Sequence, residues 1–170
     1  ICYDVNAAKV VLAYVGTSGY GRSRVGTVSG TTISFGTEVV FNSSATTWND
    51  VTYDASAQKV LVSYRGAAYG QMKVGTVSGT DISFGGDTYF EGASVRYIRS
   101  TYDPVSEQVL IAYVDEGNST RATLVAAKIT GTTVSNGTPQ AVSDTNCNDT
   151  DVAYDSTAQK AVMTYRTGNT

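Results

Sequence analysis

The 170-residue chain contains no histidine, only two cysteines and two prolines, and 16% charged residues. Without histidine it lacks a common ligand of zinc and the usual general base at neutral pH. Two cysteines cannot form the disulfide framework of a small scaffold. Cys2 and Cys147 are therefore either buried thiols or partners in a bond to something outside this stretch. The sequence predicts no metal site and no cofactor.

An excess of basic charge and long apolar runs are also missing. The 12 basic and 15 acidic residues give a net charge of −3, whereas a nucleic-acid-binding domain usually carries a basic stripe. No apolar run reaches the roughly 18–20 residues that span a bilayer. We therefore expect no nucleic-acid partner and no membrane insertion. Low charge with plentiful Gly, Ser, Thr and Tyr is common in secreted or virion-surface β proteins, so an extracellular or virion-surface location is expected.

What the sequence does contain is one hexamer in four copies, each ending in Tyr. The copies are residues 9–14, 59–64, 108–113 and 160–165. A Tyr-Asp pair precedes each copy by a short polar turn, and its tyrosine is Tyr3, Tyr53, Tyr102 or Tyr154. By subtraction these tyrosines are 50, 49 and 52 residues apart. A repeat of this length indicates a solenoid, a propeller or an array.

The hexamer has the pattern of a buried β-strand. In an extended chain Val10, Leu12 and Tyr14 share one face, and Val11 and Ala13 share the other. Because both faces are apolar, the strand is expected to be covered by neighbouring sheets on both sides. A helix is disfavoured because the runs are short, rich in β-branched residues and flanked by Gly.

Each repeat predicts four strands, called a to d. In the second repeat strand a ends at Tyr53, strand b is 59–64, strand c is 73–77, and strand d runs from 82 through a glycine kink to 90. The Asp after each repeat Tyr is interpreted as a turn residue that bonds its own backbone two residues on. A glycine in the centre of strand c indicates that another group packs closely there.

Stacked four-stranded antiparallel units of about 50 residues describe the blades of a β-propeller. The fold is therefore predicted to be all-β, with three blades and part of a fourth, and an open β array is the alternative. The expected single repeat domain is 1–170, with blades at 3–52, 53–101 and 102–153 and a partial blade at 154–170. Propellers usually have about 4–8 blades, and the chain starts inside a repeat. We therefore expect a piece of a longer polypeptide or a processed product, completed by that polypeptide or by a second chain.

The crossing from strand d to strand a carries the first candidate site. Trp48, Tyr97 and Asp149 share one position, five residues before the repeat Tyr. Together with Arg96 and Arg99, the two aromatic residues predict a rim that binds a sugar ring or a polypeptide. Aromatic rings offer flat apolar area with a polar edge, and Arg is enriched at contact sites. The alternative is that Trp48 fills a gap between neighbouring blades.

Tyr20 and Tyr69 form a second candidate site. They lie in equivalent b–c hairpins, with Arg22 and Arg65 nearby. Ordinary exposed tyrosines would give the same pattern, so both interpretations stay open at this point.

No catalytic residue is predicted. A general acid/base pair needs two carboxylates that converge on one bond, whereas the repeat aspartates occur once per unit in an identical context. An enzyme on this scaffold would need a convergent set on one rim, such as Asp50, Asp149 and Asp151.

One phrase of the repeat resembles a known group of proteins. Val-Gly-Thr-Val-Ser-Gly-Thr-x-Ile-Ser-Phe-Gly occurs at 25–36 and 74–85 and alternates with the Tyr-Asp and hexamer strands. This is similar to a tandem repeat of tail-fibre and adhesin-like proteins of marine phages, large algal viruses and aquatic bacteria. The resemblance implies a propeller-like surface module for attachment or assembly. Its expected partners are a cell-surface glycan or protein receptor, or other copies or segments of the same fibre. The rival functions are a carbohydrate-active enzyme and a purely structural fibre spacer.

Overall fold

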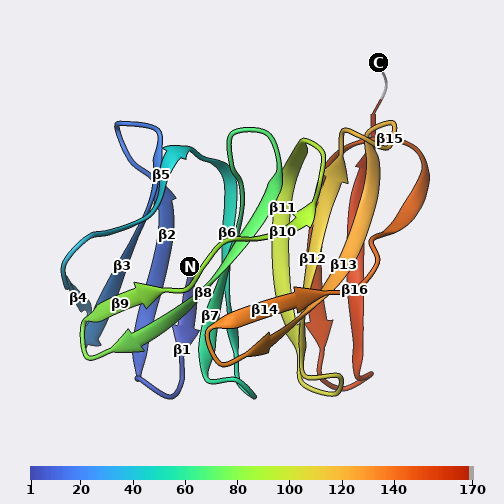
Figure 1. Ribbon diagram of the computed structural model, residues 1–170. Coiled ribbons are helices and arrows are strands. Elements are labelled where there is room, and N and C mark those ends of the chain that lie inside the picture. Colours follow the sequence, from blue (N-terminus) through green and yellow to red (C-terminus); the bar gives the residue numbers. More distant parts are fainter. Residues whose placement is uncertain (169–170) are drawn as a thin grey trace.

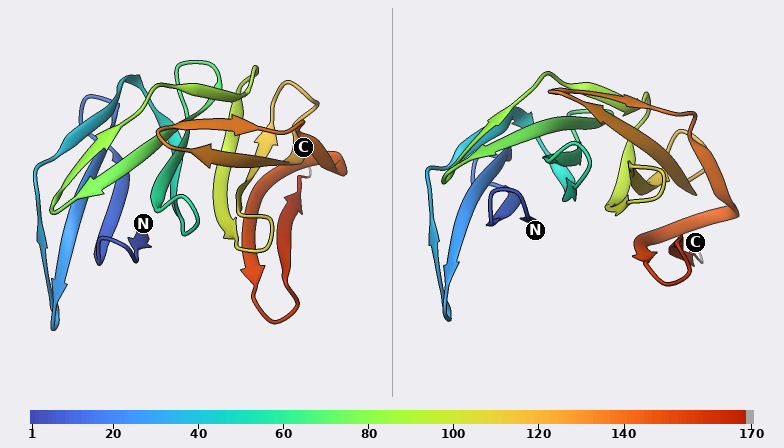
Figure 2. Two further views of the ribbon diagram at one scale, coloured as in Figure 1. Left: turned by 60° about the horizontal axis from the view of Figure 1, so that its bottom comes forward. Right: turned by 90° about the horizontal axis from the view of Figure 1, so that it is seen from below.

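The regular secondary structure of the described residues consists of β-strands. The structure is a computed structural model that describes residues 1–168, which form sixteen strands in three antiparallel sheets (Figure 1). The sheets follow one another in chain order along an arc that is open on one side (Figure 2). The all-β, antiparallel prediction is confirmed.

The first two sheets share one topology. The first contains β1 (Cys2–Asp4), β2 (Lys9–Val15), β3 (Tyr20–Ser29), β4 (Thr32–Phe35) and β5 (Val39–Ala45). The second contains β6 (Thr47–Asp54), β7 (Lys59–Arg65), β8 (Gly70–Ser78), β9 (Asp81–Phe84) and β10 (Thr88–Glu91). In each sheet the predicted strand d is two short strands, which pair with the two halves of strand c.

The third sheet runs on into a further hairpin. It contains β11 (Val95–Asp103), β12 (Gln108–Asp115), β13 (Arg121–Thr130), β14 (Thr133–Asn136), β15 (Gln140–Asp155) and β16 (Lys160–Thr167). The long β15 pairs first with β13 and then with β16, so it serves as strand d of one unit and strand a of the next. The units of the structure begin at strand a, several residues before the tyrosines that define the repeat in the sequence.

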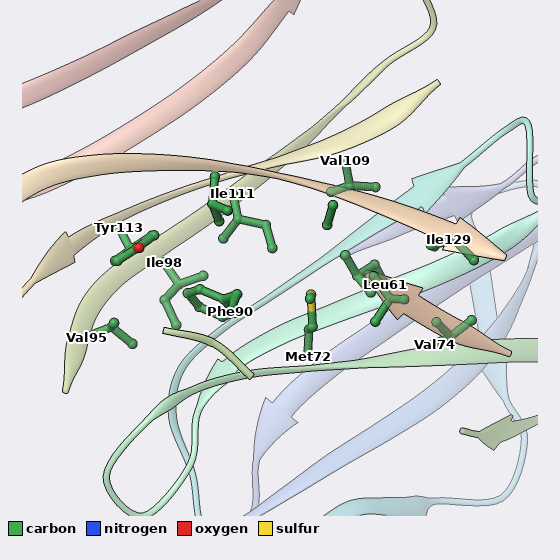
Figure 3. Packing of buried hydrophobic residues seen from close by; sticks show 13 residues of the cluster. Leu61, Met72, Val74, Phe90, Val95, Ile98, Val109, Ile111, Tyr113 and Ile129 are labelled. Atoms are coloured by element: carbon green, nitrogen blue, oxygen red, sulfur yellow. The ribbon is translucent and has the colours of Figure 1, made fainter. Parts of the chain in front are cut away.

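Two apolar cores lie between the sheets. One joins the first and second sheets through Val11, Val60 and Tyr64. The other joins the second and third sheets through Leu61, Ile111 and their neighbours (Figure 3). Since side chains alternate along a strand, β7 contributes to both cores, and its five central residues are all buried. The expectation of a strand covered on both sides is thus confirmed for β7.

The same expectation is wrong for β2 and β16. Most residues of β2 are only half-buried, and most of β16 are exposed. Their sequences match that of β7, but within residues 1–168 no sheet covers the outer face of either strand.

The central glycine of strand c lies under a large side chain, as predicted. A Cβ on Gly75 would meet Val60 Cγ2 at 2.7 Å, Ile82 Cδ1 at 2.9 Å and Phe84 Cε1 at 3.0 Å. Phe84 is the direct cross-strand partner of Gly75, so the ring covers the glycine. The packing therefore requires that the side chain at position 75 be absent.

The third sheet changes both partners of this pair together. Ala127 stands in place of the glycine, and the residue opposite it is Asn136 instead of Phe. A smaller partner leaves room for the extra methyl group, which explains why two departures from the repeat occur at facing positions.

The Tyr-Asp turns are built alike in all four copies. The carboxylate of Asp54 accepts a hydrogen bond from the Ala57 backbone N–H at 2.9 Å, three residues on. Asp103 accepts from both the second and the third residue on, Val105 and Ser106. The last residue of each turn is non-glycine in the left-handed region; these residues are Ala8, Gln58, Glu107 and Gln159. The repeat aspartate is therefore a turn residue.

The glycine–aromatic pair gives a first prediction. Gly75→Ala should destabilise the protein by about 1–3 kcal/mol, because the methyl group overpacks a filled site. The double variant Gly75→Ala/Phe84→Asn recreates the pair of the third sheet. Its loss of stability should be smaller than the sum of the losses in the two single variants, by at least about 0.5 kcal/mol. Urea unfolding followed by circular dichroism measures both.

Gly86 supplies the matched control for this cycle. A Cβ at Gly86 would meet no atom within 4 Å, so Gly86→Ala should change stability little. Strictly additive losses in the Gly75 and Phe84 cycle would show that the two positions are not coupled.

Candidate functional site

The two predicted rims lie at the same end of the sheets. The b–c hairpin and the d–a crossing of the first unit are adjacent, because the Thr46 N–H donates a hydrogen bond to the Gly19 carbonyl at 2.9 Å. In Figure 1 these loops form the upper end, whereas the Tyr-Asp turns form the lower end. All six predicted site residues belong to the strands and loops of the upper end; they are Trp48, Arg96, Tyr97, Arg99, Tyr20 and Tyr69.

Trp48 and Tyr97 come together, although they lie one repeat apart in the sequence. Their ring centroids are 4.5 Å apart, with an angle of 48° between the ring planes. Trp48 is 38% exposed, while Tyr97 is half-buried against a small cluster that includes Val114 and Cys147. Trp48 therefore bridges two neighbouring sheets and still presents part of its ring to solvent.

A bulge at the start of strand a holds each of these rings. The register of β6 with β7 shifts between Thr47 and Asp50, and that of β11 with β12 shifts in the equivalent place. Trp48 and Tyr97 have φ of 51° and 53°, which bulky residues rarely adopt. Beyond Trp48 the amide of Asn49 donates to the Ala13 carbonyl at 2.9 Å and ties the bulge to the first sheet. Strained backbone of this kind clusters at functional sites.

Arg96 is fixed beside the aromatic pair. Its guanidinium carbon lies 5.6 Å from the centre of the Tyr97 ring. Its Nε lies 2.8 Å from a carboxylate oxygen of Glu116, which also pairs with Arg65 at 3.5 Å. Glu116 thus links an arginine of the second sheet to one of the third, and it keeps the Arg96 guanidinium next to the Tyr97 ring.

Two hollows lie along this rim. One, of about 230 Å³, is bordered by Trp48, Thr47 and Arg65. The other, of about 360 Å³, is bordered by Arg99, by Asp149 and Asp151 of β15, and by residues of β16 that include Tyr165. Arg99 itself is exposed. The second hollow is polar and carries both signs of charge.

Tyr20 and Tyr69 do not join this group. Tyr69 is 46% exposed and makes an edge-to-face contact with Tyr89, with 5.6 Å between ring centroids. Tyr89 belongs to β10, which lies at the opposite edge of the second sheet from β6 and Trp48. Tyr20 begins β3, which is likewise flanked by β2 and β5 and not by β6. The two predicted rims are therefore the inner and outer parts of one end.

The three carboxylates that an enzyme would need all accept hydrogen bonds within the protein. The carboxylate of Asp50 accepts hydrogen bonds from the backbone and the hydroxyl of Ser100 in the next sheet, at 2.6 and 2.8 Å. Asp149 and Asp151 each accept one from the following backbone N–H. Of the three residues, only Asp149 and Asp151 border one hollow.

Each of the three sheets contains a tyrosine–carboxylate pair that the sequence analysis does not predict. The Tyr14 hydroxyl donates to Glu38, which also accepts from Arg22. Both hydrogen bonds lower the pKa of Glu38, and the one from Tyr14 contributes most. In the second sheet the Tyr64 hydroxyl donates to Asp87 in the same way. The pKa of Tyr64 is raised, mainly because the hydroxyl is buried and also because it donates to Asp87. The signal in the sequence is an acid 24 or 23 residues after the tyrosine that ends the hexamer.

The third sheet keeps the pair but takes the acid from elsewhere. Pro139 occupies the position of Glu38 and Asp87. The Tyr113 hydroxyl donates instead to Glu91 of the second sheet, at 3.0 Å. The buried Tyr113 hydroxyl is thus hydrogen-bonded to a carboxylate, although its own sheet has no acid at the equivalent position.

No known protein family, curated protein or solved structure matches the chain. Residues 1–168 contain no helix with the length and apolar character needed to cross a membrane. In the same part of the chain no three His, Cys, Asp or Glu side chains group closely enough to hold a metal ion.

The Glu38 cluster gives a prediction on pH. Because the pKa of Glu38 is lowered in the folded protein, its contribution to stability is present above the unfolded pKa of about 4.3 and is lost as the pH falls through the folded pKa. Glu38→Gln should therefore weaken the dependence of stability on pH in this acid range, and Tyr14→Phe should weaken it less. Urea unfolding between pH 3 and pH 7 measures this; an unchanged acid slope in both variants would contradict it.

Proposed function

We propose that the chain is a non-enzymatic attachment module that binds a glycan through its Trp48–Tyr97 rim, on the surface of a virion or a cell. The three sheets and the β15–β16 hairpin would be consecutive blades of a propeller. Support for the propeller comes from the repeated four-part units, their face-to-face stacking and their succession along an arc (Figure 2). The resemblance of residues 25–36 and 74–85 to tail-fibre and adhesin-like repeats supports attachment.

The observation that carries the proposal is the aromatic pair on strained backbone, in which Trp48 is exposed and Tyr97 is half-buried. A sugar ring presents a flat apolar side that packs on an aromatic face, and its hydroxyl groups need polar partners. Trp48 offers the face, and the hollow beside it is bordered by Arg65. The Arg96 guanidinium lies over the neighbouring Tyr97 ring, and Glu116 forms an ion pair with Arg96. A purely structural tryptophan would not need a bulge that leaves more than a third of it in solvent.

A protein receptor is the other partner that this rim would suit, since aromatic and arginine side chains are also enriched in protein interfaces. The hollows beside the rim are small, and one is bordered by charges of both signs. These features favour a ligand with many hydroxyl groups over a broad apolar contact.

A carbohydrate-active enzyme is the second candidate. The observation in its favour is that Asp149 and Asp151 border the same hollow as Arg99. If this hollow is catalytic, the wild-type chain should cleave at least one polysaccharide of a broad panel, and Asp149→Asn and Asp151→Asn should reduce the rate at least 100-fold. An inactive wild type would leave the binding function as the better proposal.

The binding proposal is tested with a glycan array and then by calorimetry with any ligand found. Trp48→Ala should weaken binding about 10-fold, or about 1.4 kcal/mol, through the lost ring contact. Arg99→Ala should weaken a ligand that extends into the larger hollow. Tyr69→Ala is the matched control, because it removes an exposed ring of the same sheet that packs on Tyr89 of β10, at the opposite edge from Trp48.

Thermal unfolding of each variant separates lost binding from lost structure. If the wild type binds no glycan on a broad array and does not adsorb to cells, the attachment role is wrong and a fibre spacer replaces it. If Trp48→Ala and Tyr69→Ala bind alike, the ligand site lies elsewhere on the molecule.

A further inference from the structure

Consecutive sheets stack with a fixed direction. Each sheet has a leading face, toward the sheet before it, and a trailing face, toward the sheet after it. In the second sheet Val60, Val62 and Tyr64 lie on the leading face, within the core shared with the first sheet. Leu61 lies on the trailing face, within the core shared with the third. The two faces differ, so one sheet's trailing face meets the next sheet's leading face.

The contacts across these two junctions recur. A Cβ on Gly36 would come within 2.1 Å of the Thr80 carbonyl oxygen of the next sheet, and one on Gly85 within 2.3 Å of that of Thr132. The repeat Tyr adds a polar contact, since the backbone N–H of Ser56 donates to the hydroxyl of Tyr102 in the next sheet at 3.2 Å. The junction between the first and second sheets therefore recurs, in the same direction, between the second and third sheets.

The leading face of the first sheet is uncovered in residues 1–168. Val10 and Leu12 are half-buried there, whereas the equivalent Val60 and Val62 are fully buried. Tyr3, which corresponds to the half-buried Tyr102, is 52% exposed. The face thus presents the apolar side chains and the tyrosine hydroxyl that a trailing face would cover.

The trailing face of the β15–β16 hairpin is uncovered as well. Val162 is 54% exposed, whereas Leu61, which holds the same place in the hexamer, is 1% exposed. The chain therefore displays both halves of its own junction, one at each end of the arc. Both ends lie toward the open side of that arc (Figure 2).

We propose that two copies of this chain associate head to tail, with the β15–β16 hairpin of each packed on strands β1 and β2 of the other. Val162 of one copy then meets Val10 of the second, as Leu61 and Val109 share one core within the chain. Tyr3 meets the 155–160 turn of the partner copy. Such unlike-face contacts close into a ring when the rotation between copies fits, and an arc open on one side is the shape that a two-fold axis can close.

The hairpin has two strands and so covers only half of the leading face. Ile33 and Phe35, on β4, stay outside this contact. The association involves faces of the sheets and not the Trp48 rim, so it does not depend on the proposed glycan binding, and either idea can fail alone.

The test is sedimentation of the full chain over a wide concentration range. The wild type should form a dimer, and Tyr3→Asp and Val162→Asp should each weaken it at least 10-fold, because each places a charge in a desolvated contact. Both positions are more than half exposed in the single chain, so the variants should still fold, which circular dichroism checks. Val105→Asp, at a 61% exposed turn position, is the matched control.

Mixing the variants gives the decisive measurement. Tyr3→Asp retains a good trailing face and Val162→Asp retains a good leading face, so an equimolar mixture should recover a dimer with one intact junction. The double variant should not dimerise with either. A wild type that stays monomeric at about 100 µM, a dimer indifferent to both substitutions, or a mixture that recovers nothing would each overturn the proposal.

Discussion

Face-to-face packing of strands that are apolar on both sides is the constraint on which the rest of the structure depends. β7 sends Tyr64 into one core and Leu61 into the next, and it cannot bury both sides against its own sheet. Each unit therefore gains stability from the neighbours against which it packs, as in other repeat architectures. The directional stacking of the sheets follows from this requirement, whereas the outer faces of the first sheet and of the β15–β16 hairpin lack such a cover within residues 1–168.

The third sheet shows how the repeat changes without losing this packing. Facing residues change together, as with Ala127 and Asn136 in place of Gly and Phe. The buried Tyr113, which has no acid at the equivalent position of its own sheet, donates its hydroxyl hydrogen bond to Glu91 of the preceding sheet. Buried groups cannot be altered singly, because a void, an overlap or an unpaired hydroxyl costs free energy. Departures from the repeat therefore occur as matched sets.

The residues of the Trp48–Tyr97 rim vary more between units than the buried residues do. At the position of the bulge the successive units carry Trp48, Tyr97 and Asp149, while strand b beneath them hardly changes. Residues at the end of a stacked sheet are free to vary because they support little of the core. The bulge, by contrast, recurs in β6, β11 and β15. The scaffold thus presents a row of equivalent positions whose side chains can differ from unit to unit.

The order of the strands, the turn aspartates, the doubly covered strand β7 and the close approach at Gly75 could all be predicted from the sequence. These features depend on alternation and turn chemistry, which are local. Only the tertiary structure showed that the Trp48 ring contacts Tyr97, that Tyr69 contacts Tyr89, that strand d divides in two, and that one face of β2 and of β16 is uncovered within residues 1–168. Such contacts depend on the distance and angle between sheets about 50 residues apart in the chain, and periodicity within one strand carries no information on either.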